Sequence, residues 1–183
     1  MNNSILFLSF FSLCFYLFLP SQCIAQTDSP ITSKSAASIE WGDQGTALGL
    51  HFGRYTYGEL GYYKSRVWAA TAPISSTSMN YGIEFSKLEE WIIAPKIQAR
   101  MSWYWFNGSL SLLYYTNWEQ YALKVRPELG IGFYNVDINY GYNIGLAKNE
   151  LNQINTHTLS MRYYLKWKRT YLQEYDVNGR PIK

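Results

Sequence analysis

The sequence is poor in the residues that most often carry chemistry. Its 183 residues include two cysteines and two histidines, and only 16% of the residues are charged. Both cysteines, Cys14 and Cys23, lie in the first 25 residues, a segment that we expect to be removed. We therefore expect no disulfide framework and no thiol nucleophile. The same scarcity predicts no metal site and no cofactor.

The sequence also has little excess of one sign of charge over the other. The formal net charge is +3, and the lysines and arginines are dispersed with no basic run. A nucleic-acid surface needs a concentrated basic patch, so we expect no nucleic-acid partner.

A long apolar run occurs at the start of the chain, from Ile5 to Leu19. It is short for a membrane-spanning helix and typical of a signal-peptide core. Small residues at the −3 and −1 positions, Cys23 and Ala25, predict a signal peptide over residues 1–25. A lipoprotein signal modified at Cys23 is the alternative. Export without cysteines in the mature chain suits the periplasm or the outer membrane.

Aromatic residues are abundant, at 18% of the chain with 17 Tyr and 7 Trp. Tyrosine and tryptophan favour boundaries between water and an apolar phase. Trp91, Trp103, Trp105, Trp118 and Trp167 fall at or beside the ends of the strands predicted below, where the aromatic girdles of a membrane barrel would lie.

A two-residue period dominates the chain from Thr46 onward. It is clearest from Leu123 to Gly145, where apolar and polar residues alternate and the parity flips after Tyr134-Asn135, as a tight antiparallel hairpin requires. We predict eight strands, at Thr46–Gly53, Tyr57–Arg66, Met79–Ser86, Ile92–Trp103, Ser109–Thr116, Gln120–Phe133, Val136–Leu146 and Asn155–Trp167. Pro95 and Pro127 fall within two of them, where a missing N–H breaks the hydrogen-bond ladder.

These strands predict an all-β fold, an eight-stranded antiparallel up-and-down transmembrane β-barrel over residues 46–167. Residues 26–45 are expected to form a periplasmic leader and residues 168–183 a periplasmic tail. A soluble barrel of the lipocalin type is the alternative, since alternation alone does not say which face is inside. Large charged residues share the polar face with many glycines, which suits a narrow interior and favours the membrane barrel.

The predicted interior carries the candidate site. Its charged members are Glu59, Glu84, Lys96, Arg100, Lys124, Arg126, Glu128 and Arg162. We interpret them as an ion-pair network that fills the lumen, because buried charges persist only when they are paired. A narrow basic conduit is the alternative. His51 shares this polar face.

The strand pattern resembles the small eight-stranded outer-membrane barrels of the OmpA- and OmpX-like class. Within it, Arg126-Pro127-Glu128-Leu129-Gly130, Tyr140-Gly141-Tyr142-Asn143 and Ile154-Asn155-Thr156-His157 resemble a signature of poorly characterised Bacteroidetes outer-membrane proteins. The resemblance implies a fold and a location and carries no chemistry.

We therefore expect a non-enzymatic barrel in the outer membrane of a Gram-negative bacterium. It would serve as a structural or accessory subunit of a larger complex for assembly, secretion or uptake. Its expected partners are outer-membrane lipids, lipopolysaccharide and another outer-membrane protein. The alternative is a barrel that handles lipids or small ligands, as an enzyme or a narrow pore. Lipid-A deacylase barrels place a serine two positions after a catalytic histidine, whereas Leu159 occupies that position after His157 here and Ser160 is expected to face inward.

Overall fold

The computed structural model describes residues 38–69, 74–87, 90–133, 135–146, 151 and 153–175. They form one antiparallel sheet whose strands are β1 (Ser38–Phe52), β2 (Tyr57–Ala69), β3 (Ser75–Lys87), β4 (Trp91–Trp103), β5 (Phe106–Thr116), β6 (Tyr121–Phe133), β7 (Val136–Tyr142), β8 (Ile144–Gly145) and β9 (His157–Tyr175). The predicted signal peptide lies outside the described residues. Within the described part, no helix is long and apolar enough to cross a membrane.

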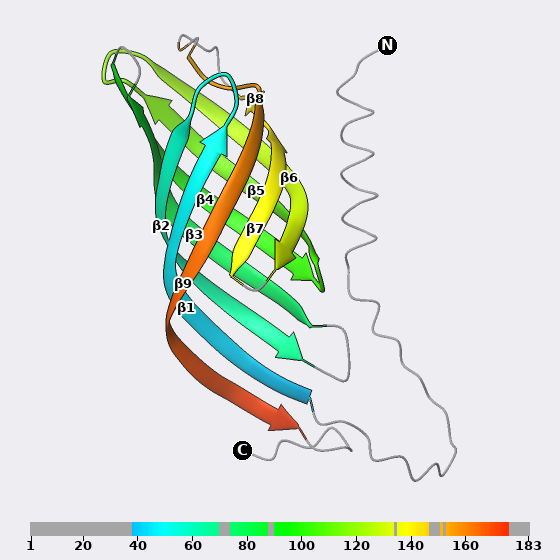
Figure 1. Ribbon diagram of the computed structural model, residues 1–183. Coiled ribbons are helices and arrows are strands. Elements are labelled where there is room, and N and C mark those ends of the chain that lie inside the picture. Colours follow the sequence, from blue (N-terminus) through cyan, green and yellow to red (C-terminus); the bar gives the residue numbers. More distant parts are fainter. Residues whose placement is uncertain are drawn as a thin grey trace. The chain divides into compact units, whose positions relative to one another are not determined.

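The sheet closes on itself. Neighbouring strands follow the order β5-β4-β3-β2-β1-β9-β7-β6, and β5 also pairs with β6. The two-residue strand β8 pairs with β6 next to β7, so it continues β7 rather than adding a member. The result is a ring of eight antiparallel strands (Figure 1). The predicted all-β class and the predicted number of strands around the ring are confirmed.

The pairing of β6 with β7 follows the parity flip in the sequence. Phe133 lies opposite Val136, and Glu128 lies opposite Gly141. Polar residues of both strands consequently share one face, which is the interior of the ring.

Several strands are longer than predicted. β1 begins at Ser38 instead of Thr46, and β9 ends at Tyr175 instead of Trp167. Their added parts pair with each other, and the added part of β1 also pairs with β2. These parts consist mostly of polar, glycine and aromatic residues, so the apolar alternation that marks the other strands does not extend into them. Residues 38–45 and 168–175 are therefore strand, whereas the predicted leader over 26–37 and the predicted tail over 176–183 lie outside the described residues.

Pro127 and Pro95 each lie at an interruption in a ladder. β6 pairs with β8 through Lys124 and Val125 and with β7 from Glu128 onward, so the ladder stops at Arg126 and Pro127. Because proline has no N–H to donate, the strand opposite it loses no hydrogen bond where it is interrupted between β7 and β8. The register of β4 with β5 has a similar gap at Ala94 and Pro95.

The ring has two different ends. The terminal end holds the first and last described strand residues, Ser38 and Tyr175, which lie opposite each other. It also holds the short connections from β4 to β5 and from β6 to β7. The connection from β2 to β3 lies at this end as well, and the loop end holds the other connections, of which the longest joins β8 to β9.

The two faces of the ring differ sharply in polarity. Large apolar side chains are exposed on the outer face, among them Leu48, Leu50, Phe52, Leu60, Met79, Tyr81, Ile83, Phe85, Ile97, Met101, Leu110, Leu112, Tyr114, Leu129, Ile131, Ile138, Tyr140, Leu159, Met161, Tyr163 and Leu165. The interior is mainly polar, with a cluster of apolar and tyrosine side chains near the loop end. This is the opposite of a lipocalin-type barrel, whose interior is apolar.

Candidate functional site

Charged side chains from five strands meet in the middle of the ring. We call this set, together with His51 of β1, the buried ion-pair network. Its charged members are Glu59 of β2, Glu84 of β3, Lys96 of β4, Arg126 and Glu128 of β6, and Arg162 of β9. All of these side chains are at most 1% exposed.

Arg162 links two distant strands. Its Nε donates to Glu59 Oε2 at 2.7 Å, and its Nη1 and Nη2 donate to the two carboxylate oxygens of Glu128 at 2.7 and 2.8 Å. The paired bonds to Glu128 form a bidentate fork, the strongest geometry for an arginine and a carboxylate. Gln98 and Ser109 also donate to Glu128, each at 2.9 Å.

Arg126 makes the corresponding fork with Glu84. Its Nη1 and Nη2 donate to the two oxygens of Glu84 at 2.8 and 2.7 Å, and its Nε donates to Asn143 Oδ1 at 2.9 Å. Asn143 lies at the break between β7 and β8, where its backbone N–H donates to Thr156 O instead of to β6. The interruption next to Pro127 therefore releases a residue that binds the network.

Glycines make room for these long side chains. A Cβ atom at Gly141 would lie 3.0 Å from carbons of both Arg126 and Glu128, and one at Gly49 would lie 2.9 Å from Glu59 Oε2. Real Cβ atoms almost never make contacts under 3.0 Å, and contacts at 3.0 Å are tighter than nearly all of those observed, so a side chain at either glycine would require its neighbours to shift.

The network is electrically balanced. Lys96 pairs with Glu59 and, at 3.4 Å, with Glu84, so three carboxylates face three cations. An isolated charge would be very costly in such an interior, whereas a balanced and hydrogen-bonded set is tolerated. Each charge therefore depends on the others.

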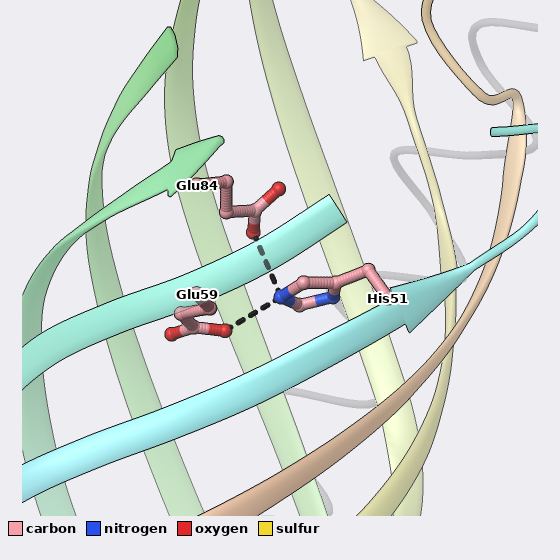
Figure 2. Close-up of side chains that lie close together, drawn as sticks. All are labelled: His51, Glu59 and Glu84. Atoms are coloured by element: carbon pink, nitrogen blue, oxygen red, sulfur yellow. Dashed lines mark hydrogen bonds and ion pairs between the residues drawn. The ribbon is translucent and has the colours of Figure 1, made fainter. Parts of the chain in front are cut away.

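His51 lies at the centre of the network, where Figure 2 shows its ring facing Glu59 and Glu84. Its Nε2 is 2.7 Å from Glu59 Oε2 and 3.3 Å from Glu84 Oε1. Its Nδ1 is 2.8 Å from Ser160 Oγ and 3.4 Å from Arg126 Nη1. Since arginine can only donate, Nδ1 acts as the acceptor and Nε2 carries the proton.

His51, Glu59 and Glu84 bring one potential metal-ligand atom each within 4.8 Å of one another. The surroundings do not fit a cation, because Lys96, Arg126 and Arg162 already neutralise the carboxylates. A divalent ion here would add charge beside three cations. We therefore interpret the group as part of the ion-pair network.

Ser160, His51 and Glu59 also have the order of a nucleophile, a base and an orienting carboxylate. Ser160 and His51 are both 0% exposed, and the network surrounds them. Among the described residues, the Ser160 hydroxyl is therefore enclosed, and we interpret it as a member of the hydrogen-bonded network.

Two predicted site residues are not joined to the network by the ion pairs above. Arg100 lies nearer the terminal end and pairs with Asp137, its Nη2 donating to Oδ1 at 2.8 Å. Its guanidinium also lies 5.1 Å from the ring centre of Tyr164. Lys124 is buried on the same inner face, opposite Leu113 of β5. The other six predicted residues come together.

The predicted site left out several uncharged partners of the network. Ser160, Asn143 and Gln98 lie at inward positions of their strands, as parity predicts, but the predicted site counted charged residues alone. Tyr115 gave no such signal, because its neighbours Leu113 and Ala122 make that stretch look apolar. Its hydroxyl bonds Glu84 and Arg126.

An apolar cluster occupies the interior near the loop end. It consists of Tyr57, Ile92, Ala94, Leu113, Tyr115, Ala122 and Leu151, of which Leu151 comes from the connection between β8 and β9. Asn155 in the same connection bonds both backbone groups of Tyr55, as acceptor at 2.8 Å and donor at 2.6 Å. Tyr57 Oη donates to Gln153 O at 2.7 Å. Part of the longest connection thus folds into this end of the interior.

His157 faces outward, away from the network. Its Nδ1 lies 2.5 Å from Tyr140 Oη, and its ring makes an edge contact with Tyr142. Leu159 is exposed at the position where a deacylase dyad has its serine, and Ser160 faces the interior. His157 and Ser160 therefore lie on opposite faces of the sheet and do not form such a dyad.

The chain matches no protein-family model, no curated protein and no solved structure. The ring of eight strands is the part of the resemblance to small outer-membrane barrels that the structure carries.

Proposed function

We propose that the protein is a transmembrane β-barrel of a bacterial outer membrane that serves as a non-enzymatic, structural subunit of a larger complex. The observation that carries the proposal is the outer face of the ring. Among the described strand residues, the exposed charged side chains of this face are Lys64, Arg66 and Lys87 near strand ends and Lys168 in the last part of β9. Between these positions the outer face is apolar.

An apolar outer face of this kind is unfavourable in contact with water. Soluble monomers rarely expose contiguous apolar patches larger than a few hundred Å². Here side chains such as Leu50, Ile97 and Leu159 are about half exposed on strands all round the ring. Contact with lipid removes the unfavourable free energy of exposing these apolar side chains to water. A closed ring also leaves no strand edge to face lipid.

The buried charges are consistent with this location because they face inward. A charge that faces hydrocarbon is expensive, but charges inside a bundle or barrel are tolerated when they pair. Every charged member of the network is paired within the ring.

Aromatic side chains lie near both ends of the ring. Trp103, Tyr104 and Trp105 are more than half exposed at the turn between β4 and β5 at the terminal end, and Trp91 and Tyr121 are so at the loop end. This supports two interfacial girdles. Short turns at the end that carries both described termini support a periplasmic terminal end.

The interior supports a structural role rather than conduction. The ion-pair network fills its middle, and the apolar cluster with Leu151 fills the interior near the loop end. The connections from β1 to β2 and from β5 to β6 are short, so the outer wall and the terminal end are the larger surfaces available to a partner.

Two experiments test this proposal. For location, Ile97→Arg should cost about 2–4 kcal/mol of folding free energy in lipid vesicles, as expected near a bilayer midplane. The matched control is Ile74→Arg, which changes an equally exposed isoleucine at the terminal end and should cost less than about 1 kcal/mol. Equal effects of the two substitutions would contradict the membrane location.

For the accessory role, the tagged protein is isolated from its own outer membrane in mild detergent. We expect a stable complex with another outer-membrane protein. Recovery as a monomer alone would overturn the role while leaving the location intact.

A further inference from the structure

β9 extends well beyond its neighbour on one side. It pairs with β7 through residues 157–163 and with β1 through residues 159–175. The backbone N–H of Tyr164 donates to Asn135 O, next to the turn between β6 and β7. In Figure 1, β9 and β1 continue together past the ends of β6 and β7. We call residues 165–175 of β9 the extension edge.

The extension edge is an unpaired strand edge. Its inner side is hydrogen-bonded to β1, and no described strand pairs with its outer side. All described side chains from Leu165 to Leu172 are exposed. Such an edge presents a row of backbone donors and acceptors that a further strand can use.

Specific contacts hold the extension edge in strand conformation. Arg169 donates to Asp43 Oδ1 and Oδ2 at 2.8 and 2.9 Å and lies over the ring of Trp41 at 4.8 Å. Register shifts lie between Glu40 and Trp41 and between Gln44 and Gly45 of β1. They leave residues 168–171 as a regular run between two bulges, which limits any added strand to a defined register.

The charge on this part of the sheet is positive. Lys166 and Lys168 are exposed on the extension edge, and Lys64 is exposed on β2 near the same end. Lysine on an edge opposes pairing with neutral or basic strands and favours an acidic one. The edge therefore selects by charge among the strands that could add to it.

A second copy of this chain does not fit. Antiparallel pairing of two identical edges places the two-fold axis perpendicular to the sheet. Because the wall of a barrel stands upright in the bilayer, that axis would lie in the membrane plane and turn one copy upside down. Copies inserted in one direction do not meet in this way.

We propose that the extension edge binds an extended acidic segment of a different protein by strand addition. The inference rests on the proposed membrane location and names the contact through which the proposed accessory role would operate. Backbone bonds along residues 168–171 would supply the pairing, and Lys166 and Lys168 would supply the preference for acidic side chains.

The test uses the full-length protein in detergent micelles and a synthetic peptide of alternating glutamate and valine, about ten residues long. We expect the peptide to bind and to slow hydrogen exchange at residues 165–175. Lys166→Glu with Lys168→Glu should weaken binding about tenfold or more. Lys87→Glu, which reverses an exposed lysine at the loop end, should leave binding unchanged.

Three results would overturn the inference. They are equal binding of a peptide with lysine in place of glutamate, slow exchange of the extension edge before any peptide is added, and a dimer of the free protein joined at this edge. The second result would mean that another segment already covers the edge.

The proposed function and this inference fail separately. If a complex isolated from the outer membrane survives the double lysine substitution, the accessory role stands and the extension edge is not its contact. If the peptide binds as expected but no complex is isolated, the edge stands and the accessory role fails.

Discussion

Removing one charge from the buried ion-pair network should destabilise the whole ring. Glu128→Gln keeps the size of the side chain but removes the negative charge that receives the fork of Arg162 and faces Arg126 at 3.6 Å. The interior would then hold one uncompensated positive charge. Breaking a buried pair by removing one partner costs about 3–5 kcal/mol, and we expect a loss in this range.

The double variant Glu128→Gln with Arg162→Met tests whether charge imbalance is the cause. It leaves two carboxylates, Glu59 and Glu84, facing two cations, Lys96 and Arg126. We therefore expect it to be more stable than the single Glu128 variant by about 2 kcal/mol, because the coupling energy of buried partners is of this order.

The measurement is reversible urea unfolding in lipid vesicles, followed by tryptophan fluorescence. Glu119→Gln, at an exposed loop position, is the control and should change the free energy by less than about 0.5 kcal/mol. If Glu128→Gln behaves like this control, or if the double variant loses the sum of the two single losses, the balanced-charge explanation is refuted.

Three further predictions concern other parts of the molecule. Burial acts to raise the pKa of Asp43, but the hydrogen bonds and charge of Arg169 lower it below its ordinary 3.8. This pair's stability is thus present above the ordinary pKa of 3.8 and lost as pH falls through the lowered pKa, so wild type should lose its advantage over Asp43→Asn in urea unfolding as the pH falls below the ordinary value. Asn155→Ala should cost about 1–3 kcal/mol and speed hydrogen exchange at Tyr55, with no change at the extension edge. A fluorophosphonate probe should leave Ser160 unlabelled in the folded protein, and labelling would show access to its hydroxyl.

The sequence was sufficient to predict the ring because the two-residue period is strong wherever one face meets an apolar phase. In β6 the alternation of Leu123, Val125 and Leu129 with charged residues fixes which side chains share a face. The parity flip after Asn135 then fixes the register of β7. Both signals are local, so they survive without knowledge of the rest of the fold.

The extension of β1 and β9 could not be predicted in the same way. Around Trp41 and Asp43 both sides of the sheet carry polar or aromatic residues, so the apolar period disappears although the strand continues. The contact of Arg169 with Asp43 joins residues 126 positions apart, and local patterns carry no information about such a pair. Periodicity reports the polarity of the surroundings rather than the backbone conformation itself.

Parity placed charged residues on one face, but it could not say which of them meet. Arg100 and Arg162 share the same parity, yet one pairs with Asp137 and the other with Glu128. The difference arises from the stagger of the strands, which sets the height of each side chain along the ring. Stagger depends on every register at once, so a single sequence does not reveal it.

The topology of the network links its stability to closure of the ring. Arg162 lies on β9, which joins the first strand to the last hairpin, and it bonds Glu59 on β2 and Glu128 on β6. Before β9 docks, both carboxylates lack this partner, and the network holds three carboxylates against two cations. Closure therefore supplies the missing cation together with two rows of backbone bonds. A ring that closes in a shifted register would place Arg162 away from both carboxylates, so the buried ion-pair network favours one register over its alternatives.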